Sequence, residues 1–189
     1  MNKTILANYT PKQTVLRVTL VALFAALIAG GSFVSIPLPF SPVPIVLQNL
    51  FIVLAGLVLG PVLGPASVAL FLIAGALGLP VFSGAGGGIA RFASPTGGFL
   101  IGYFFASLFA GIVAGTPKKD ISLFRIILAA ALGFLVIYVP GLFWLYRFLG
   151  SWPRTLAAGF FPFLIGDAIK AAIASTVAKR LRRTAADHL

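Results

Sequence analysis

Residues 160–175 read FFPFLIGDAIKAAIAS, an apolar stretch that contains one acid, Asp167, and one base, Lys170. The chain has three acidic residues, and the other two, Asp120 and Asp187, fall in a basic loop and in the C-terminal tail. On a helix, a spacing of three places Asp167 and Lys170 on the same face. Because a charge at the centre of a bilayer costs about 3 kcal/mol, we expect this pair to be functional and to face the interior of a bundle.

The composition around this stretch is that of an integral membrane protein. Hydrophobic residues make up 60% of the 189 residues and charged residues only 9%, whereas about 25% of a soluble domain is charged. This length accommodates about six spans of about 20 residues, so the sequence predicts a single integral membrane domain over residues 1–189. The absence of cysteine excludes a disulfide framework and thiol chemistry.

The apolar runs predict an all-α bundle of six transmembrane helices. Between the first two runs, the proline-rich stretch IPLPFSPVP at 36–44 favours a stiff, extended connection. Gly60 and Pro61 mark a tight break, and residues 80–98, PVFSGAGGGIARFASPTGG, predict a glycine-rich loop. The expected spans are 15–36, 45–59, 62–79, 99–114, 123–146 and 156–177.

The net charge of +11 follows membrane topology rather than nucleic-acid binding. Most basic residues fall on one side of the predicted spans, and the positive-inside rule places that side, with both termini, in the cytoplasm. Arg91, Arg147 and Arg154 fall on the outer side, together with the glycine-rich loop. Asp167 would then lie about 16 Å into the last span, near mid-membrane. The inner cations, from the basic N-terminal tail 1–14 to the C-terminal tail 179–189, are Lys3, Lys12, Arg17, Lys118, Lys119, Arg125, Lys179, Arg180, Arg182 and Arg183.

Small residues recur four apart in several spans, as helices need for close approach in lipid. Gly56, Gly60 and Gly64 form one such series, which packing within the chain explains. In the first span the pairs are Ala22 with Ala26 and Ala25 with Ala29. Because this span lies at the edge of the chain, its alanine face is a candidate surface for docking a partner protein.

The side chains available exclude most catalysis and metal binding. The single histidine, His188, lies in the tail, no cluster of metal-ligating residues is present, and no P-loop motif is available for ATP. What remains is a set of residues suited to binding a small molecule: a carboxylate that accepts hydrogen bonds from ligand N–H groups, cations for a carboxylate or carbonyl, amides and aromatic rings. The candidates are Asp167, Lys170, Arg91, Gln48, Asn49, Phe82, Phe92 and Tyr103, with Tyr138 and Trp144 as further aromatic neighbours.

Each candidate also has a purely structural interpretation. Asp167 and Lys170 could form an internal ion pair that ties the last span to its neighbours. Arg91 could be a solvated loop charge. Gln48 and Asn49 could make hydrogen bonds between helices.

The chain resembles the BioY family, the biotin-specific S-components of energy-coupling-factor (ECF) transporters. The resemblance covers nearly the whole chain, in family order. It rests on ALFAALIA in the first span, IPLPFSPVPIVLQNLFIVLAGLVLGP, LFLIAGALGLPVF, SPTGGFLIGY and FPFLIGDAIKAAIA.

This resemblance implies a six-helix subunit of a prokaryotic-type plasma membrane that captures biotin from outside. It implies as partners a scaffold transmembrane protein, which docks on Ala22, Ala25, Ala26 and Ala29, and two ABC-type ATPases that supply the ATP chemistry. It also places Asp167 and Lys170 at the biotin site, with no cofactor beyond the transported ligand. The alternatives are an S-component for another vitamin, a small intramembrane enzyme, or a structural membrane subunit without a ligand.

Overall fold

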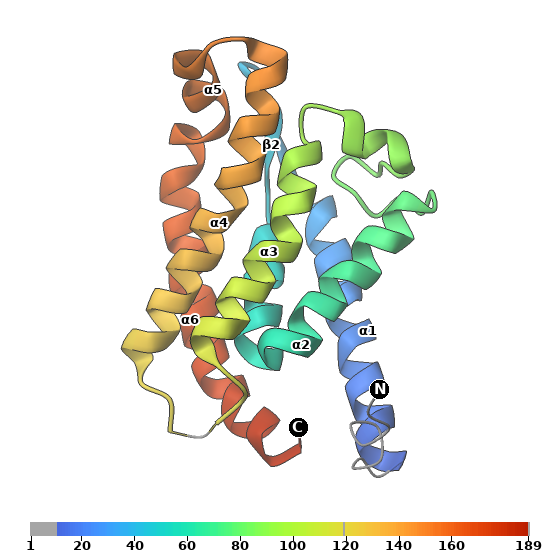
Figure 1. Ribbon diagram of the computed structural model, residues 1–189, viewed down its shortest axis with the longest axis vertical. Coiled ribbons are helices and arrows are strands. Elements are labelled where there is room, and N and C mark those ends of the chain that lie inside the picture. The colour runs from blue at the N-terminus through green and yellow to red at the C-terminus, as the bar shows by residue number, and fades with distance from the viewer. Residues whose placement is uncertain (1–10, 119, 189) are drawn as a thin grey trace, which may run out of the picture.

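The computed structural model of the protein describes residues 11–118 and 120–188 and shows an elongated bundle of helices (Figure 1). The first ten residues, with Lys3, and residues Lys119 and Leu189 lie outside the described residues. Within the described part, five segments are long and apolar enough to cross a membrane. They are α1 (Pro11–Phe33), α2 (Gln48–Ala76), α3 (Gly97–Ala114), α4 (Leu123–Leu149) and the segment Trp152–Ala186.

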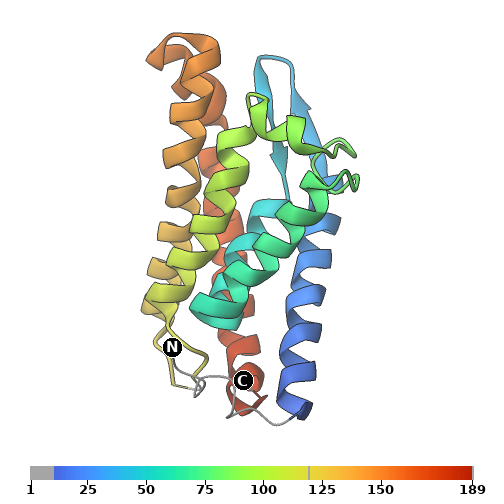
Figure 2. The same ribbon diagram turned by 45° about the vertical axis from the view of Figure 1, so that its right-hand side comes forward.

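Helix α2 is sharply bent, and its two arms correspond to the predicted runs 45–59 and 62–79. The bend is at Gly60, whose φ of 80° and ψ of −169° lie in a region that only glycine enters readily. Pro61 follows, where its fixed φ suits the first residue of a helical arm. The arms fold back on one another, since a Cβ built on Gly64 would lie 2.7 Å from the Cα of Gly56. Figure 2 shows them as the two limbs of a V.

The proline-rich connection is extended, as predicted, and forms a hairpin that the sequence did not predict. Strand β1 (Ser35–Leu38) pairs antiparallel with β2 (Ser41–Val46), with Ile36 opposite Ile45. In a two-stranded sheet every strand is an edge, so the prolines of β2 break no central ladder. The Ser41 hydroxyl donates to the Ala158 carbonyl at 2.6 Å, which fastens the hairpin to the C-terminal part of the bundle.

The glycine-rich loop at 80–98 is folded and anchored at three points. It contains a short 3₁₀ helix, η1 (Ile89–Ala93). The Ser32 hydroxyl donates to the Val81 carbonyl at 2.6 Å, the Gly88 amide to the Gly75 carbonyl at 2.7 Å, and the Trp144 indole to the Ser94 carbonyl at 2.9 Å. The loop and the hairpin lie at the same end of the bundle, opposite the start of α1 and the end of α6 (Figure 2).

Small residues let the central helices touch backbone to backbone. A Cβ on Gly98 would lie 2.4 Å from the Pro140 carbonyl oxygen of α4, and a Cβ on Gly56 would lie 2.2 Å from the Ser107 carbonyl oxygen of α3. These distances are too short for any side chain. The prediction that Gly56 and Gly64 pack within the chain is confirmed.

The prediction of a single helix over 156–177 is wrong. This part of the chain forms α5 (Trp152–Gly159), the 3₁₀ turn η2 (Phe161–Phe163) and α6 (Leu164–His188). The break follows from Pro162, which has no N–H group and disfavours the helical conformation of the residue before it. Helix α6 also continues past Val177 through the basic tail. Arg182, which the sequence placed in the basic C-terminal tail, is fully buried.

Candidate functional site

Asp167 lies in the first turn of α6 and is 6% exposed. Lys170 donates to its Oδ1 at 2.9 Å, and the Tyr138 hydroxyl of α4 donates to its Oδ2. The partial positive charge of the α6 N-terminus further favours a carboxylate at this position. The expected proximity of Asp167 and Lys170 is confirmed. The break at Pro162 explains why α6 begins just before Asp167.

A small internal cavity of about 20 Å³ lies beside the Asp167 carboxylate. Polar groups reach it from three long helices: Asn49 of α2, Tyr103 of α3, and Tyr138 of α4. Its remaining lining is apolar and comes from the hairpin, the helices and η2. These residues are Val43, Pro44, Val46, Phe99, Ile137 and Phe163.

Two further cavities continue this space toward the loop end of the molecule. One of about 30 Å³ shares Tyr103 and Phe99 with the first and adds Gln48 and Arg91. The outermost, about 410 Å³, shares Arg91 with the second and Pro44 with both. A row of hollows therefore runs from the outer rim to Asp167, and the hairpin lines it throughout.

Gln48 and Asn49, the first two residues of α2, carry buried polar atoms without a partner among the described residues. These atoms are Nε2 of Gln48 and Oδ1 of Asn49. A buried polar atom left unpaired costs about 1–3 kcal/mol. The two amides line neighbouring cavities, so one donor and one acceptor are available to a ligand. The alternative that they bond neighbouring helices is not supported for these two atoms.

Arg91 is half-buried, and its guanidinium makes no hydrogen bond or ion pair to the described part of the chain. It lies across Gly86, where a Cβ would come within 2.1 Å of Nη2. Glycine at position 86 therefore lets the guanidinium lie over the loop and line the two outer cavities. An unpaired guanidinium in such a position suits a carboxylate, which it binds in a bidentate manner.

The predicted aromatic residues take different places. Tyr103 lines both inner cavities. Phe82 is 2% exposed and lines the middle cavity, packed edge-on between Phe71 and Phe92 at centroid distances of 5.4 and 5.8 Å. Phe92 supports Phe82 from behind and lines none of the three cavities, and Trp144 anchors the loop.

Several lining residues were not among the predicted site residues. Tyr138, noted only as an aromatic neighbour, is a direct partner of Asp167. Its signal was a hydroxyl within an otherwise apolar span. The sequence could not show that Val43 and Pro44 line the cavities, because a proline-rich stretch indicates only an extended backbone.

The four alanines of α1 divide between two faces. Ala22 and Ala26 are exposed, whereas Ala25 is 8% exposed and packs in the core, and Ala29 is partly buried against it. Ala26 also lines an open apolar groove of about 350 Å³ between α1 and α2, together with Gly30 and Phe51.

The described residues contain no group of three His, Cys, Asp or Glu side chains that could hold a metal ion. A multi-pass helical bundle that encloses a carboxylate, a lysine and unpaired amides beside a row of cavities is a membrane-embedded binding protein for a small molecule.

Comparison with known proteins identifies the particular kind. A model of the BioY family matches residues 2–187, and the chain belongs to this family. It is 44% identical over 165 residues to a probable biotin transporter BioY of Pyrococcus horikoshii, covering 87% of this chain and 95% of the relative. It is 37% identical over 161 residues to the biotin transporter BioY of Thermotoga maritima, covering 85% and 92%.

The fold agrees with a solved structure. The crystal structure of the S-component for biotin from an ECF-type ABC transporter superposes with a TM-score of 0.84 at 33% identity, covering 93% of this chain and 95% of the other. The S-component-like fold expected from the sequence is confirmed.

Proposed function

We propose that this chain is a biotin-binding S-component, a subunit of an ECF-type transporter that captures the vitamin and is not an enzyme. The observation that carries the proposal is the closed polar site at Asp167. Unpaired amide atoms of Gln48 and Asn49 and an unpaired guanidinium of Arg91 lie along one row of cavities. A ligand with N–H donors at one end and a carboxylate at the other complements this row.

The order of the polar groups along the cavities favours one orientation of bound biotin. The N–H groups of its ureido ring would meet Asp167 and Asn49 Oδ1, which are the acceptors of the innermost cavity. Its ring system would pack against Tyr103 and Phe99, which line both inner cavities. Its valerate carboxylate would then reach Arg91, where the outer cavity begins.

The proposed topology has six membrane crossings, with the two arms of α2 counted separately and both termini in the cytoplasm. The V shape of α2 supports this count (Figure 2). The distribution of Lys and Arg supports the orientation. The glycine-rich loop and the hairpin would then face the outside of a plasma membrane, where the ligand arrives. The chain would act as one integral membrane domain over residues 1–189.

The proposed partners are a scaffold transmembrane protein and two ABC-type ATPases, because this chain carries no ATP-binding motif. The scaffold would dock on the exposed stripe of small residues on α1. Ala22, Ala26 and Gly30 are spaced four apart and are all exposed, as close helix packing in lipid requires.

One calorimetric titration tests the function. Purified protein in detergent is titrated with biotin, and in separate runs with thiamine and riboflavin. Binding of biotin at one site per chain, with no heat from the other two vitamins, is the expected result. Preference for another vitamin would reassign the ligand, and absence of binding to all three would make the chain a structural subunit.

A further inference from the structure

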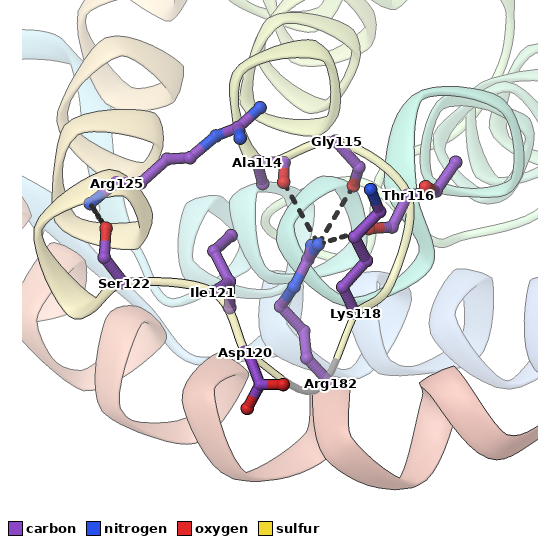
Figure 3. A pocket seen from close by; sticks show the side chains of 9 residues that line it. All are labelled: Ala114, Gly115, Thr116, Lys118, Asp120, Ile121, Ser122, Arg125 and Arg182. Atoms are coloured by element: carbon purple, nitrogen blue, oxygen red, sulfur yellow. Dashed lines mark hydrogen bonds between the residues drawn. The ribbon is translucent and has the colours of Figure 1, made fainter.

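A further pocket, of about 360 Å³, lies between the end of α3, the start of α4 and the last turns of α6. These elements meet at the end of the bundle opposite the hairpin (Figure 1), and Figure 3 shows the side chains that line the pocket. It shares no lining residue with the cavities near Asp167. Three cations line it: Lys118, Arg125 and Arg182.

Arg182 is the unusual member of this pocket, because its guanidinium is 0% exposed yet faces no carboxylate in the described chain. It donates to the carbonyls of Ala114 at 3.1 Å, Gly115 at 3.1 Å and Thr116 at 2.6 Å, and to that of Leu57. These carbonyls stabilise the cation through their dipoles but leave its full charge uncompensated. Its Nε has no partner among the described residues.

The other groups of the pocket add to this positive charge. The Nε of Arg125 donates to the Val113 carbonyl at 2.6 Å, and its Nη2 lies near Gly115. Lys118 is exposed, with no hydrogen bond or ion pair to the described chain. The N-terminus of α4, capped by Ser122, directs its partial positive charge to the same place. The one acid, Asp120, makes no ion pair with these cations, and Figure 3 shows its carboxylate turned away from them.

The surface beside the pocket is apolar. Leu123, Phe124, Ile127 and Leu128, in the first turns of α4, are 44–76% exposed. In a membrane such side chains contact acyl chains. A basic pocket directly next to a lipid-facing surface matches the two halves of a phospholipid, a charged headgroup and an apolar tail.

We propose that this pocket binds the phosphate group of an anionic phospholipid, with the headgroup between Lys118, Arg125 and the buried Arg182. The bound phosphate compensates the charge that Arg182 carries into the bundle. It thereby stabilises the contacts of Arg182 with Leu57, just before the bend of α2, and with the end of α3. These contacts hold α6, on which Asp167 and Lys170 lie, against the two helices. This inference does not depend on which vitamin the protein binds.

The test uses the full-length protein in a non-ionic detergent, with thermal unfolding followed by tryptophan fluorescence. Short-chain phosphatidylglycerol, short-chain phosphatidylcholine and inorganic phosphate are titrated separately. Phosphatidylglycerol is expected to raise Tm in a saturable way that weakens with salt, whereas phosphatidylcholine and millimolar phosphate leave Tm unchanged. Phosphate as effective as phosphatidylglycerol would overturn the lipid assignment in favour of the free ion.

Variants locate the effect. Lys118→Gln with Arg125→Gln should raise the half-saturating phosphatidylglycerol concentration on the order of 10- to 30-fold, since each cation near a lipid headgroup contributes to binding. Arg147→Gln with Arg154→Gln removes the same charge at the other end and should leave that concentration unchanged. If the double variant does not fold, Lys118→Gln alone should still shift it several-fold.

Two outcomes would overturn the proposal. One is the same half-saturating concentration in wild type and in the Lys118 and Arg125 variants. The other is loss of co-purification with a membrane partner in those variants with no lipid effect, which would assign the pocket to an acidic protein surface instead.

Discussion

Tyr138 and Asp167 are 29 positions apart, and the phenol of one donates directly to the carboxylate of the other. Lys170 occupies the second carboxylate oxygen, so the acid is held from α4 and from its own helix at once. Each carboxylate oxygen accepts more than one hydrogen bond. The carboxylate is therefore oriented in advance and still has acceptor capacity for a ligand.

Asp167→Asn should weaken biotin binding by about 2 kcal/mol, on the order of 30-fold, because a charge-assisted hydrogen bond becomes a neutral one. Tyr138→Phe should cost less, about 1 kcal/mol, since it removes one hydrogen bond to the carboxylate and leaves the charge of Asp167 in place. Calorimetric titration of both variants checks this order. Equal affinity of wild type and a folded Asp167→Asn variant would remove the residue from the site.

Arg91→Gln should reduce affinity for biotin at least about 10-fold, through loss of a charge-assisted contact with the ligand carboxylate. The same change should leave affinity for biotin amide, which has no charged carboxylate, nearly unaltered. A double-mutant cycle over the two proteins and two ligands isolates the interaction. Parallel losses for both ligands would assign Arg91 to holding the loop instead.

Ala26→Leu should preserve biotin binding and abolish co-purification with the scaffold protein, because Ala26 is exposed on the small-residue stripe. Ala25→Leu is the matched control, because Ala25 is 8% exposed and packs in the core. Overpacking at this position should lower the free energy of unfolding by about 1–3 kcal/mol, which a lower Tm would report. If Ala26→Leu leaves the complex intact, the scaffold docks elsewhere.

Trypsin offers a test of both topology and loop ordering, because Arg91 is the one Lys or Arg within residues 80–98. In right-side-out vesicles, external trypsin should cut after Arg91, and saturating biotin should slow this cut, since ligand binding stabilises the closed loop. Lys118, in the loop at the other end, should be cut only in inverted vesicles. Cleavage after Arg91 at an unchanged rate with biotin would contradict the ordering of the loop.

Gly60→Ala should lower the free energy of unfolding by about 1–3 kcal/mol, because alanine is strained at the φ and ψ of the α2 bend. Gly30→Ala is the control: a Cβ there has no neighbour within 4 Å, and within a helix alanine is favoured over glycine by about 0.5–1 kcal/mol. Thermal unfolding of both variants gives the comparison. A neutral Gly60→Ala would show that the bend tolerates a side chain.

The sequence predicted those parts of the fold that depend on local chemistry. The spans that became α3 and α4 begin within two residues of the expected positions, because polar or glycine-rich segments border them. The bend at Gly60 was visible as a Gly–Pro pair. The break before α6 was missed, although Pro162 marked it, because apolar residues surround that proline on both sides and hide the interruption.

Contacts between distant segments could not be predicted in the same way. The position of Arg91 depends on the Trp144 anchor to Ser94 and on the space above Gly86, neither of which a local pattern records. The burial of Arg182 was unexpected for a similar reason. The carbonyls that accept its hydrogen bonds lie 66 or more positions away in the chain.

The space of about 20 Å³ beside Asp167 has a consequence for rates. It holds about one water molecule, whereas small-molecule pockets measure about 300–1,000 Å³. We therefore expect the innermost part of the site to open only when the loop or the hairpin moves aside. Association then proceeds no faster than this opening, and its observed rate levels off as vitamin concentration increases. The same barrier would slow escape, so we expect the bound vitamin to dissociate slowly. Release would then be the step that the proposed ATPase partners drive.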